Sequence, residues 1–170
     1  MSKPIGPLVS SSHLVAEGAA ELSEFEFGLT LANNAFQRWI VQCMAAAGYP
    51  DLGALDVHVL HIVNHRERAK KLADICLVLN IEDTHIVNYA LKKLLKMELV
   101  AGEKAGKENY YSTTAAGAEA CQRYRDVRDS CLVNAFGAFG GEEKTVGELA
   151  GLLRALSGLY DQAARTAASL

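Results

Sequence analysis

The sequence predicts a mainly helical domain that carries one small β-hairpin. Apolar residues recur at spacings of three and four along most of the 170 residues, which is typical of helices that face a core. Between residues 99 and 113 this spacing gives way to an alternation, with Gly106 between two strand-like runs. Half of the residues are apolar and 22% are charged, so the composition is that of a folded globular protein.

The N-terminal part predicts a flexible arm followed by a long helix. Residues 1–22 are small and polar and are expected to form the arm. Ser23 and Glu26 resemble a capping box, and Gly48 terminates the helix predicted over residues 23–47. This helix is long for a domain of this size and carries large apolar residues off its main stripe. We therefore expect a partner subunit to cover part of it.

Three shorter helices are predicted before the hairpin. Their apolar patterns place them at residues 55–64, at 70–79 and from about 84 to 97. Asp83 or Thr84 can cap the third of these helices. The last two helices are separated by a short turn, which indicates a helix-turn-helix unit.

Two more helices are predicted after the hairpin. Thr114 is expected to cap a helix over residues 115–135. Three glycines break the pattern within residues 136–141, and a last helix is predicted over 146–167. Residues 23–170 are thus expected to form one domain, in which a wing at about 99–113 follows the helix-turn-helix.

Three stretches of sequence carry a resemblance to a known family. The stretches KKLADICLVLN, DTHIVNYALKKLLKMELV and YYSTTAAGAEA resemble the helix-turn-helix and wing of the MarR family of winged-helix transcription regulators. The resemblance covers residues 23–165. The family's Leu-Thr-x-x-Gly signature corresponds here to Thr113, Thr114, Ala115, Ala116 and Gly117. The resemblance implies a winged helix-turn-helix core flanked by long N- and C-terminal helices that intertwine with those of a second chain.

The sequence departs from the family pattern at four positions. Tyr89 occupies the place of a usual arginine in the recognition helix, and Glu98 that of a glycine before the final Leu-Val. In the wing, Ala105 and Lys107 stand where the family commonly has an acid and an arginine. These departures favour an alternative function, a winged helix that binds other proteins and no DNA.

The candidate DNA-binding side chains lie on the predicted recognition helix and the wing. Asn88 can bond adenine in a bidentate manner, His85 lies near the helix start, and Tyr89 can contact a phosphate or a thymine methyl group. Lysines are flexible point charges that suit phosphates. The complete set is His85, Asn88, Tyr89, Lys92, Lys93, Lys96, Lys104 and Lys107. The alternative is that they form only the solvated face of an amphipathic helix and a polar hairpin.

The resemblance also implies a homodimer and a small-molecule effector. Aromatic and apolar residues of the first helix are candidates for an effector pocket, with core packing as the alternative: Phe36, Trp39 and Ile40. Apolar residues of the last helix are candidates for the dimer core, with an intramolecular helical core as the alternative: Leu149, Leu153, Leu156 and Tyr160.

Histidines and cysteines give no complete metal site and imply no cofactor. His58, His61 and His65 share one face of a helix, but no further ligand is evident nearby, so we expect solvated or capping histidines, with a transition-metal site as the alternative. The cysteines show no zinc-binding spacing and are expected to be buried free thiols: Cys43, Cys76, Cys121 and Cys131.

Charge and motifs narrow the classes of function. The net charge is −3, which counts mildly against nucleic-acid binding, yet residues 64–125 contain eleven Lys or Arg and eight Asp or Glu. No catalytic motif occurs, and GAFGG at 137–141 is expected to be a hinge. Neither a secretory signal nor a membrane-spanning stretch is evident. We predict a cytoplasmic homodimeric transcription regulator that binds specific double-stranded DNA, with no enzymatic activity and no membrane partner.

Overall fold

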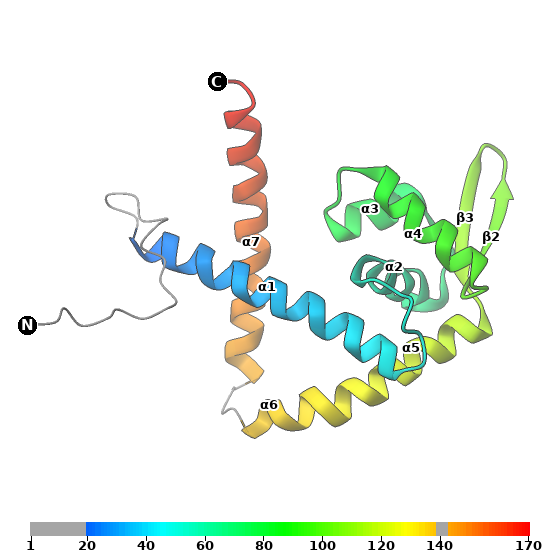
Figure 1. The fold of residues 1–170 in the computed structure, drawn as a ribbon. Coiled ribbons are helices and arrows are strands. Elements are labelled where there is room, and N and C mark those ends of the chain that lie inside the picture. The colour runs from blue at the N-terminus through cyan, green and yellow to red at the C-terminus, as the bar shows by residue number, and fades with distance from the viewer. Residues whose placement is uncertain (1–19, 139–142) are drawn as a thin grey trace, which may run out of the picture. The chain divides into compact units, whose positions relative to one another are not determined.

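The computed structural model describes residues 20–138 and 143–170 (Figure 1). The chain divides after Arg125 into two compact units, each described here by itself. In order, the described elements of the first unit are α1 (Ala20–Ala46), α2 (Ala54–Asn64), η1 (His65–Glu67), β1 (Lys70–Lys71), α3 (Leu72–Leu79), α4 (Thr84–Lys96), β2 (Val100–Ala105), β3 (Glu108–Thr113) and most of α5 (Ala115–Arg128). No helix among the described residues has both the length and the apolarity to cross a membrane.

Helix α1 begins and ends close to where the sequence predicts. It starts at Ala20, so residues 20–22 belong to the helix and not to the expected arm, whereas residues 1–19 lie outside the described residues. Gly48 ends it with a φ of 101°, a backbone conformation that favours glycine. Its C-terminal part contributes Ile40, Cys43 and Met44 to the core of the first unit, and Ser23 near its start is also buried.

The helix-turn-helix consists of α3 and α4, and the cap predicted at Asp83 is confirmed. Asn80 ends α3 in the left-handed region, with a φ of 52°. Asp83 caps α4, because its carboxylate accepts a hydrogen bond of 2.9 Å from the backbone N–H of His85. The predicted start of α3 is wrong by two residues, since Lys70 and Lys71 form strand β1 instead.

The three strands form an antiparallel sheet in the order β1-β3-β2. Ala105 pairs with Glu108 at the tip of the β2–β3 hairpin, which leaves Gly106 and Lys107 as a two-residue loop. Gly106 has a φ of 65°, as such a tight loop requires. The hairpin that the sequence predicts is therefore confirmed, and Figure 1 shows it as a ribbon beside α4.

Helix α2 supplies the centre of the hydrophobic core. Val57, Val59, Leu60 and Val63 are all at most 1% exposed, which places apolar residues on more than one side of the helix. The remaining fully buried large residues come from neighbouring elements and include Leu52, Ile75, Val87, Leu91, Leu94 and Leu99. The core therefore packs α4 against α2 and includes the start of β2.

The start of α5 is joined closely to the end of α4. Thr114 caps α5 as predicted, because its hydroxyl accepts a bond of 3.0 Å from the N–H of Gly117 and donates one of 2.7 Å to the carbonyl of Glu98. A Cβ on Gly117 would lie 2.0 Å from the carbonyl oxygen of Leu99, so only glycine permits this approach. This close approach is the physical reason for the glycine in the Thr-Thr-Ala-Ala-Gly stretch.

The second unit contains η2 (Asp129–Val133), α6 (Asn134–Ala138) and α7 (Glu143–Ala167). The helix predicted over 115–135 thus includes a π-helical turn and continues to residue 138, into the break predicted over 136–141. Residues 139–141 of that break lie outside the described residues. Helix α7 begins three residues before its predicted start and has no buried residue among those described.

Candidate nucleic-acid interface

Helix α4 separates a buried face from an outward row of polar side chains. Its buried residues, at spacings of three and four, are Val87, Ala90, Leu91 and Leu94. Because successive residues rotate by about 100° around a helix, the opposite side carries His85, Tyr89, Lys92 and Lys96, all of which are exposed. We call these four residues the outward row. Four of the eight sequence-predicted contacts therefore share one exposed face.

Asn88 lies on the flank of this row and is only partly exposed. Together with Lys71, Thr84 and Asn109 it lines a cavity of about 350 Å³ between the start of α3, α4 and β3. Its amide therefore faces a recess beside the outward row. A base edge or a phosphate that entered this recess would meet a donor and an acceptor on the same side chain.

Lys93 differs from the other predicted lysines because its ammonium group is used inside the fold. It forms an ion pair of 2.7 Å with Asp56 and donates a hydrogen bond to the backbone carbonyl of Asp51. Asp56 is 7% exposed and also accepts a bond of 2.8 Å from the N–H of Gly53, at the start of α2. Lys93 thus ties α4 to α2, and we exclude it from the candidate interface.

The wing presents exposed lysines in an environment of mixed charge. Lys104 and Lys107 are exposed near the hairpin tip, as a nucleic-acid contact requires. Glu108 forms an ion pair of 2.8 Å with Lys71, and the hydrogen bond between them raises the pKa of that lysine. Lys71 is therefore partly neutralised, whereas no ion pair is found for either wing-tip lysine within the described residues.

Ile86 is an exposed residue of α4 that sequence reasoning missed. Its side chain is 45% exposed, whereas that of the next residue, Val87, is buried. A helical projection places Ile86 about 90° from both the buried face and the outward row. That projection, applied to the sequence, is the signal that could have found it.

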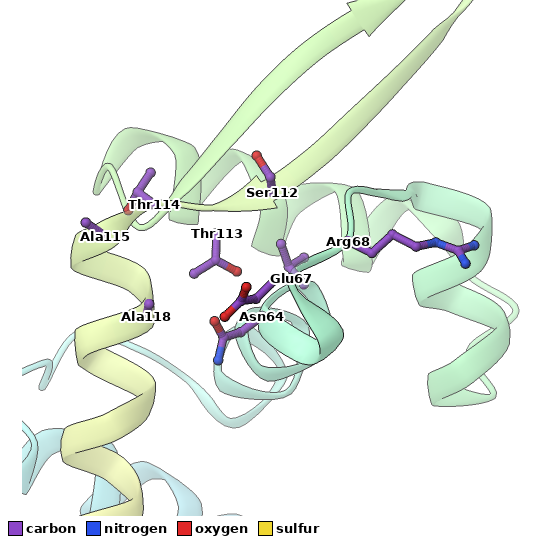
Figure 2. Close-up of a pocket in the computed structure, with 9 residues that line it drawn as sticks. Asn64, Glu67, Arg68, Ser112, Thr113, Thr114, Ala115 and Ala118 are labelled. Atoms are coloured by element: carbon purple, nitrogen blue, oxygen red, sulfur yellow. The ribbon is translucent and has the colours of Figure 1, made fainter.

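A small cavity of about 290 Å³ with polar and apolar lining lies where the wing meets α2 and α5 (Figure 2). Figure 2 shows Asn64, Glu67 and Thr113 gathered in it, whereas Arg68 points away. The hydroxyl of Thr113 is buried and has no hydrogen-bond partner. Arg66 and Glu67, just after α2, have positive φ values of 60° and 47°. No pattern in the sequence predicted this cavity.

The three predicted histidines have different environments. His61 is largely buried, its ring packs edge-on against Tyr124 with 4.7 Å between centroids, and its Nε2 atom has no hydrogen-bond partner. Burial, with smaller effects of Arg125 and His58, lowers the pKa of His61 to about 4. Burial also lowers the pKa of His58, whereas His65 is exposed. Within the described ranges, no three His, Cys, Asp or Glu side chains are placed to hold a metal ion together.

The predicted effector-pocket residues are not equivalent either. Phe36 is 50% exposed and lies near His58, with 6.1 Å between ring centroids, and Trp39 is partly buried. Ile40 is 1% exposed and belongs to the core, the alternative given for it. Only Phe36 and Trp39 therefore present surface that a bound molecule can contact.

The cysteines follow the prediction with one exception. Cys43, Cys76 and Cys121 are buried and form no disulfide among the described residues, and burial raises the pKa of Cys121 to about 11. Cys131 is exposed, so the expectation that it is buried is wrong. It lies in the π-helical turn of the second unit, where no described residue is buried.

The predicted dimer residues of α7 remain accessible in the single chain. Leu149 is 49% exposed and Leu153 is 37% exposed, and Leu156 and Tyr160 are partly buried. Because the four residues are spaced by three and four, they form one apolar row along α7. Within the described residues of the second unit, this row is not enclosed in a core.

Comparison with known families identifies the central segment. Residues 52–117 match the family model described as a winged helix DNA-binding domain. They run from the loop before α2 into the first turn of α5 and so include the helix-turn-helix and the wing. No curated protein matches the sequence significantly.

Solved structures share the fold over most of the chain. A MarR family transcriptional regulator from Rhodococcus sp. RHA1 has a TM-score of 0.66 at 12% identity, covering 79% of this chain and 92% of its own. CouR from Rhodococcus jostii RHA1, bound to p-coumaroyl-CoA, has a TM-score of 0.66 at 13% identity, covering 78% and 91%. A MarR family regulator from Neisseria meningitidis has a TM-score of 0.65 at 18% identity, covering 84% and 95%.

Proposed function

We propose that this chain, a winged-helix protein with the fold of MarR-family regulators, is a homodimeric transcription regulator that binds specific DNA sequences in the cytoplasm. One observation carries the proposal. The outward row of α4, formed by His85, Tyr89, Lys92 and Lys96, lies free of the core beside an exposed wing. A helix of this kind fits the major groove, where its first turns meet base edges and its lysines meet phosphates.

The homodimer is supported by the apolar surface of α7. A helix of 25 residues with no buried residue exposes Leu149, Leu152 and Leu159 to water by 49 to 59%. Burying such side chains is worth about 1.5 to 3 kcal/mol each, so a second copy of α7 is a favourable partner. Two copies would place two recognition helices at two half-sites of an operator.

An effector site is supported by a cavity next to α2. This cavity of about 520 Å³ is lined by His61, Arg66 and Arg125, among other residues, so two guanidinium-bearing side chains border it. The proposed ligand is therefore an anionic small molecule. CouR, which has the same fold, was solved with the anionic thioester p-coumaroyl-CoA.

The function is tested by fluorescence anisotropy with DNA from upstream of the gene and a scrambled duplex, over a range of salt concentrations. Lys92→Ala and Lys96→Ala are expected to weaken binding. Each should also reduce the slope of log affinity against log salt by about 0.9 for every phosphate that is no longer neutralised. Lys93→Ala is the matched control, because this lysine pairs with Asp56 inside the fold. It should lower thermal stability and leave the salt slope unchanged.

A second outcome would favour the alternative function. If folded wild-type dimer bound neither duplex at low salt, with and without p-coumaroyl-CoA, the DNA-binding proposal would be contradicted. The winged helix would then be better explained as a protein-binding module, a role compatible with the acidic net charge of −3. Equal, salt-sensitive binding to both duplexes would contradict the sequence specificity alone.

A further inference from the structure

We propose that α4 recognises thymine methyl groups through Ile86 and Tyr89, so that each operator half-site carries thymines where the first turns of the helix enter the groove. This inference rests on the proposed DNA-binding function and deepens it. It names the chemical class of base edge that the site reads, and it adds Ile86 to the specificity-determining residues.

Both side chains are exposed on the surface of α4. Tyr89 is 73% exposed and Ile86 is 45% exposed, although both present large apolar surfaces to water. Neither can enter the core, because Val87, Ala90 and Leu91 already occupy the buried face of α4. Residues three apart lie next to each other on a helix, so Ile86 and Tyr89 form one continuous apolar patch.

This patch lies at the end of the helix that reads bases. Ile86 and Tyr89 belong to the first two turns of α4, which begins at Thr84. Recognition helices of helix-turn-helix proteins contact base edges with their N-terminal residues. The lysines of the outward row, Lys92 and Lys96, lie farther along the helix, where contacts with the phosphate backbone are expected.

Thymine is the base whose chemistry complements the patch. In the major groove only thymine presents a methyl group, whereas guanine is read by an arginine or a lysine that bonds O6 and N7, and the lysines of the outward row lie beyond the first two turns of α4. No arginine occurs in α4, so the guanidinium fork that reads guanine is absent from this helix. When this apolar patch is buried against thymine methyl groups, the removal of its surface from water stabilises the complex.

Charge favours DNA over a protein as the occupant of this patch. Lys92 and Lys96 continue the same side of α4, and Lys104 and Lys107 are exposed on the wing of the same unit. An apolar patch of two residues with cations beside it matches a groove in which methyl groups lie between phosphates. A protein partner would need a much larger apolar surface to bind stably.

The test replaces thymine with deoxyuracil. A preferred duplex is first selected from a random pool with the wild-type dimer, and its thymines are then replaced by deoxyuracil, which removes the methyl groups and keeps every hydrogen bond. Wild-type protein should bind the deoxyuracil duplex roughly tenfold more weakly, since each buried methyl group corresponds to about a fourfold change in affinity.

Variants distinguish direct contact from a change in DNA shape. Ile86→Ala and Tyr89→Ala should each reduce the ratio between the thymine and deoxyuracil affinities toward one, because the partner of the methyl group is gone. Both positions are exposed, so the fold is expected to be retained. Lys96→Ala is the matched control, which should weaken both duplexes equally and leave the ratio unchanged.

The outcomes separate this inference from the function on which it rests. Tight binding with equal affinity for the two duplexes would overturn the thymine proposal and leave the regulator proposal intact. A wild-type ratio that neither apolar variant changed would overturn it as well, because the effect would then come from DNA shape. Failure to select any duplex would overturn both proposals.

Discussion

The winged-helix segment and helix α7 differ in whether their large apolar side chains are buried within the chain. In the segment matched by the family model, residues 52–117, large side chains such as Leu60, Leu91 and Leu94 are completely buried. Helix α7 is also rich in leucine, yet no described residue of this helix is buried. The first region therefore encloses its core within one chain, whereas the leucines of the second stay outside any core among the described residues of that unit.

We call residues 52–117 the closed region. Its backbone segments approach each other closely where the wing ends, at Leu99 and Gly117. Gly117→Ala would force a Cβ to within 2.0 Å of the Leu99 carbonyl oxygen, so we expect the free energy of unfolding to fall by more than about 3 kcal/mol. Urea unfolding followed by circular dichroism measures this change. It is the largest effect expected, because backbone on both sides of the contact must move.

Gly158→Ala is the matched control from helix α7, which we call the open region. A Cβ at Gly158 in α7 meets no atom within 4 Å, so alanine should stabilise the helix by up to about 1 kcal/mol. Equal destabilisation by the two substitutions would contradict the contrast between the closed and open regions.

The proposed dimer interface is tested at the apolar row of α7. Leu153→Glu should raise the dimer dissociation constant at least about 100-fold, because each subunit then buries a carboxylate where it had a leucine. Analytical ultracentrifugation measures the change. Arg154→Glu introduces the same side chain about 100° around α7 from Leu153 and should leave the dimer intact. A variant Leu153→Glu that remained dimeric would show that this row is not the interface.

The buried imidazole in the closed region predicts a dependence of stability on pH. His61 has a pKa of about 4 in the folded chain and about 6.5 when unfolded, so below pH 6.5 the unfolded state binds the extra proton. Stability is therefore complete above pH 6.5 and falls as the pH decreases toward 4, by roughly 2 to 3 kcal/mol.

Replacing His61 isolates its share of this dependence. The variant His61→Gln should unfold with a flatter pH profile between pH 6.5 and 4 than the wild type. The control His65→Gln changes an exposed histidine of the same row and should keep the wild-type profile. Identical profiles for the wild type and His61→Gln would contradict the burial effect.

The smallest effect is expected at Glu98, where the chain departs from the family's glycine. Glu98 has a positive φ of 57°, which glycine adopts without strain. Glu98→Gly should therefore stabilise the fold by about 0.5 to 1 kcal/mol, measured by urea unfolding. Glu98→Ala keeps a Cβ and should give no such gain. Destabilisation by the glycine would imply that the Glu98 side chain has a stabilising contact of its own.

Local signals in the sequence determined most of the secondary structure. The caps at Asp83 and Thr114, the turn at Asn80 and the glycine at the hairpin tip each act through nearby backbone groups, so their effect is visible in the residues alone. Strand β1 could not be predicted in the same way. Its two residues are too few to show a period, and they are extended because Lys70 and Lys71 pair with Tyr111 and Tyr110.

The candidate interface was predicted as a set of residue types, and the tertiary structure decided which of them are available. Lys92 and Lys93 are adjacent and chemically identical in the sequence, yet only Lys93 meets the buried carboxylate of Asp56, 37 residues earlier. His58, His61 and His65 share one helix face, but only folding places the Tyr124 ring against that of His61 and the charge of Arg125 close enough to lower its pKa. Helical period fixes the direction of a side chain, whereas its charge state and partners depend on distant segments that folding brings beside it.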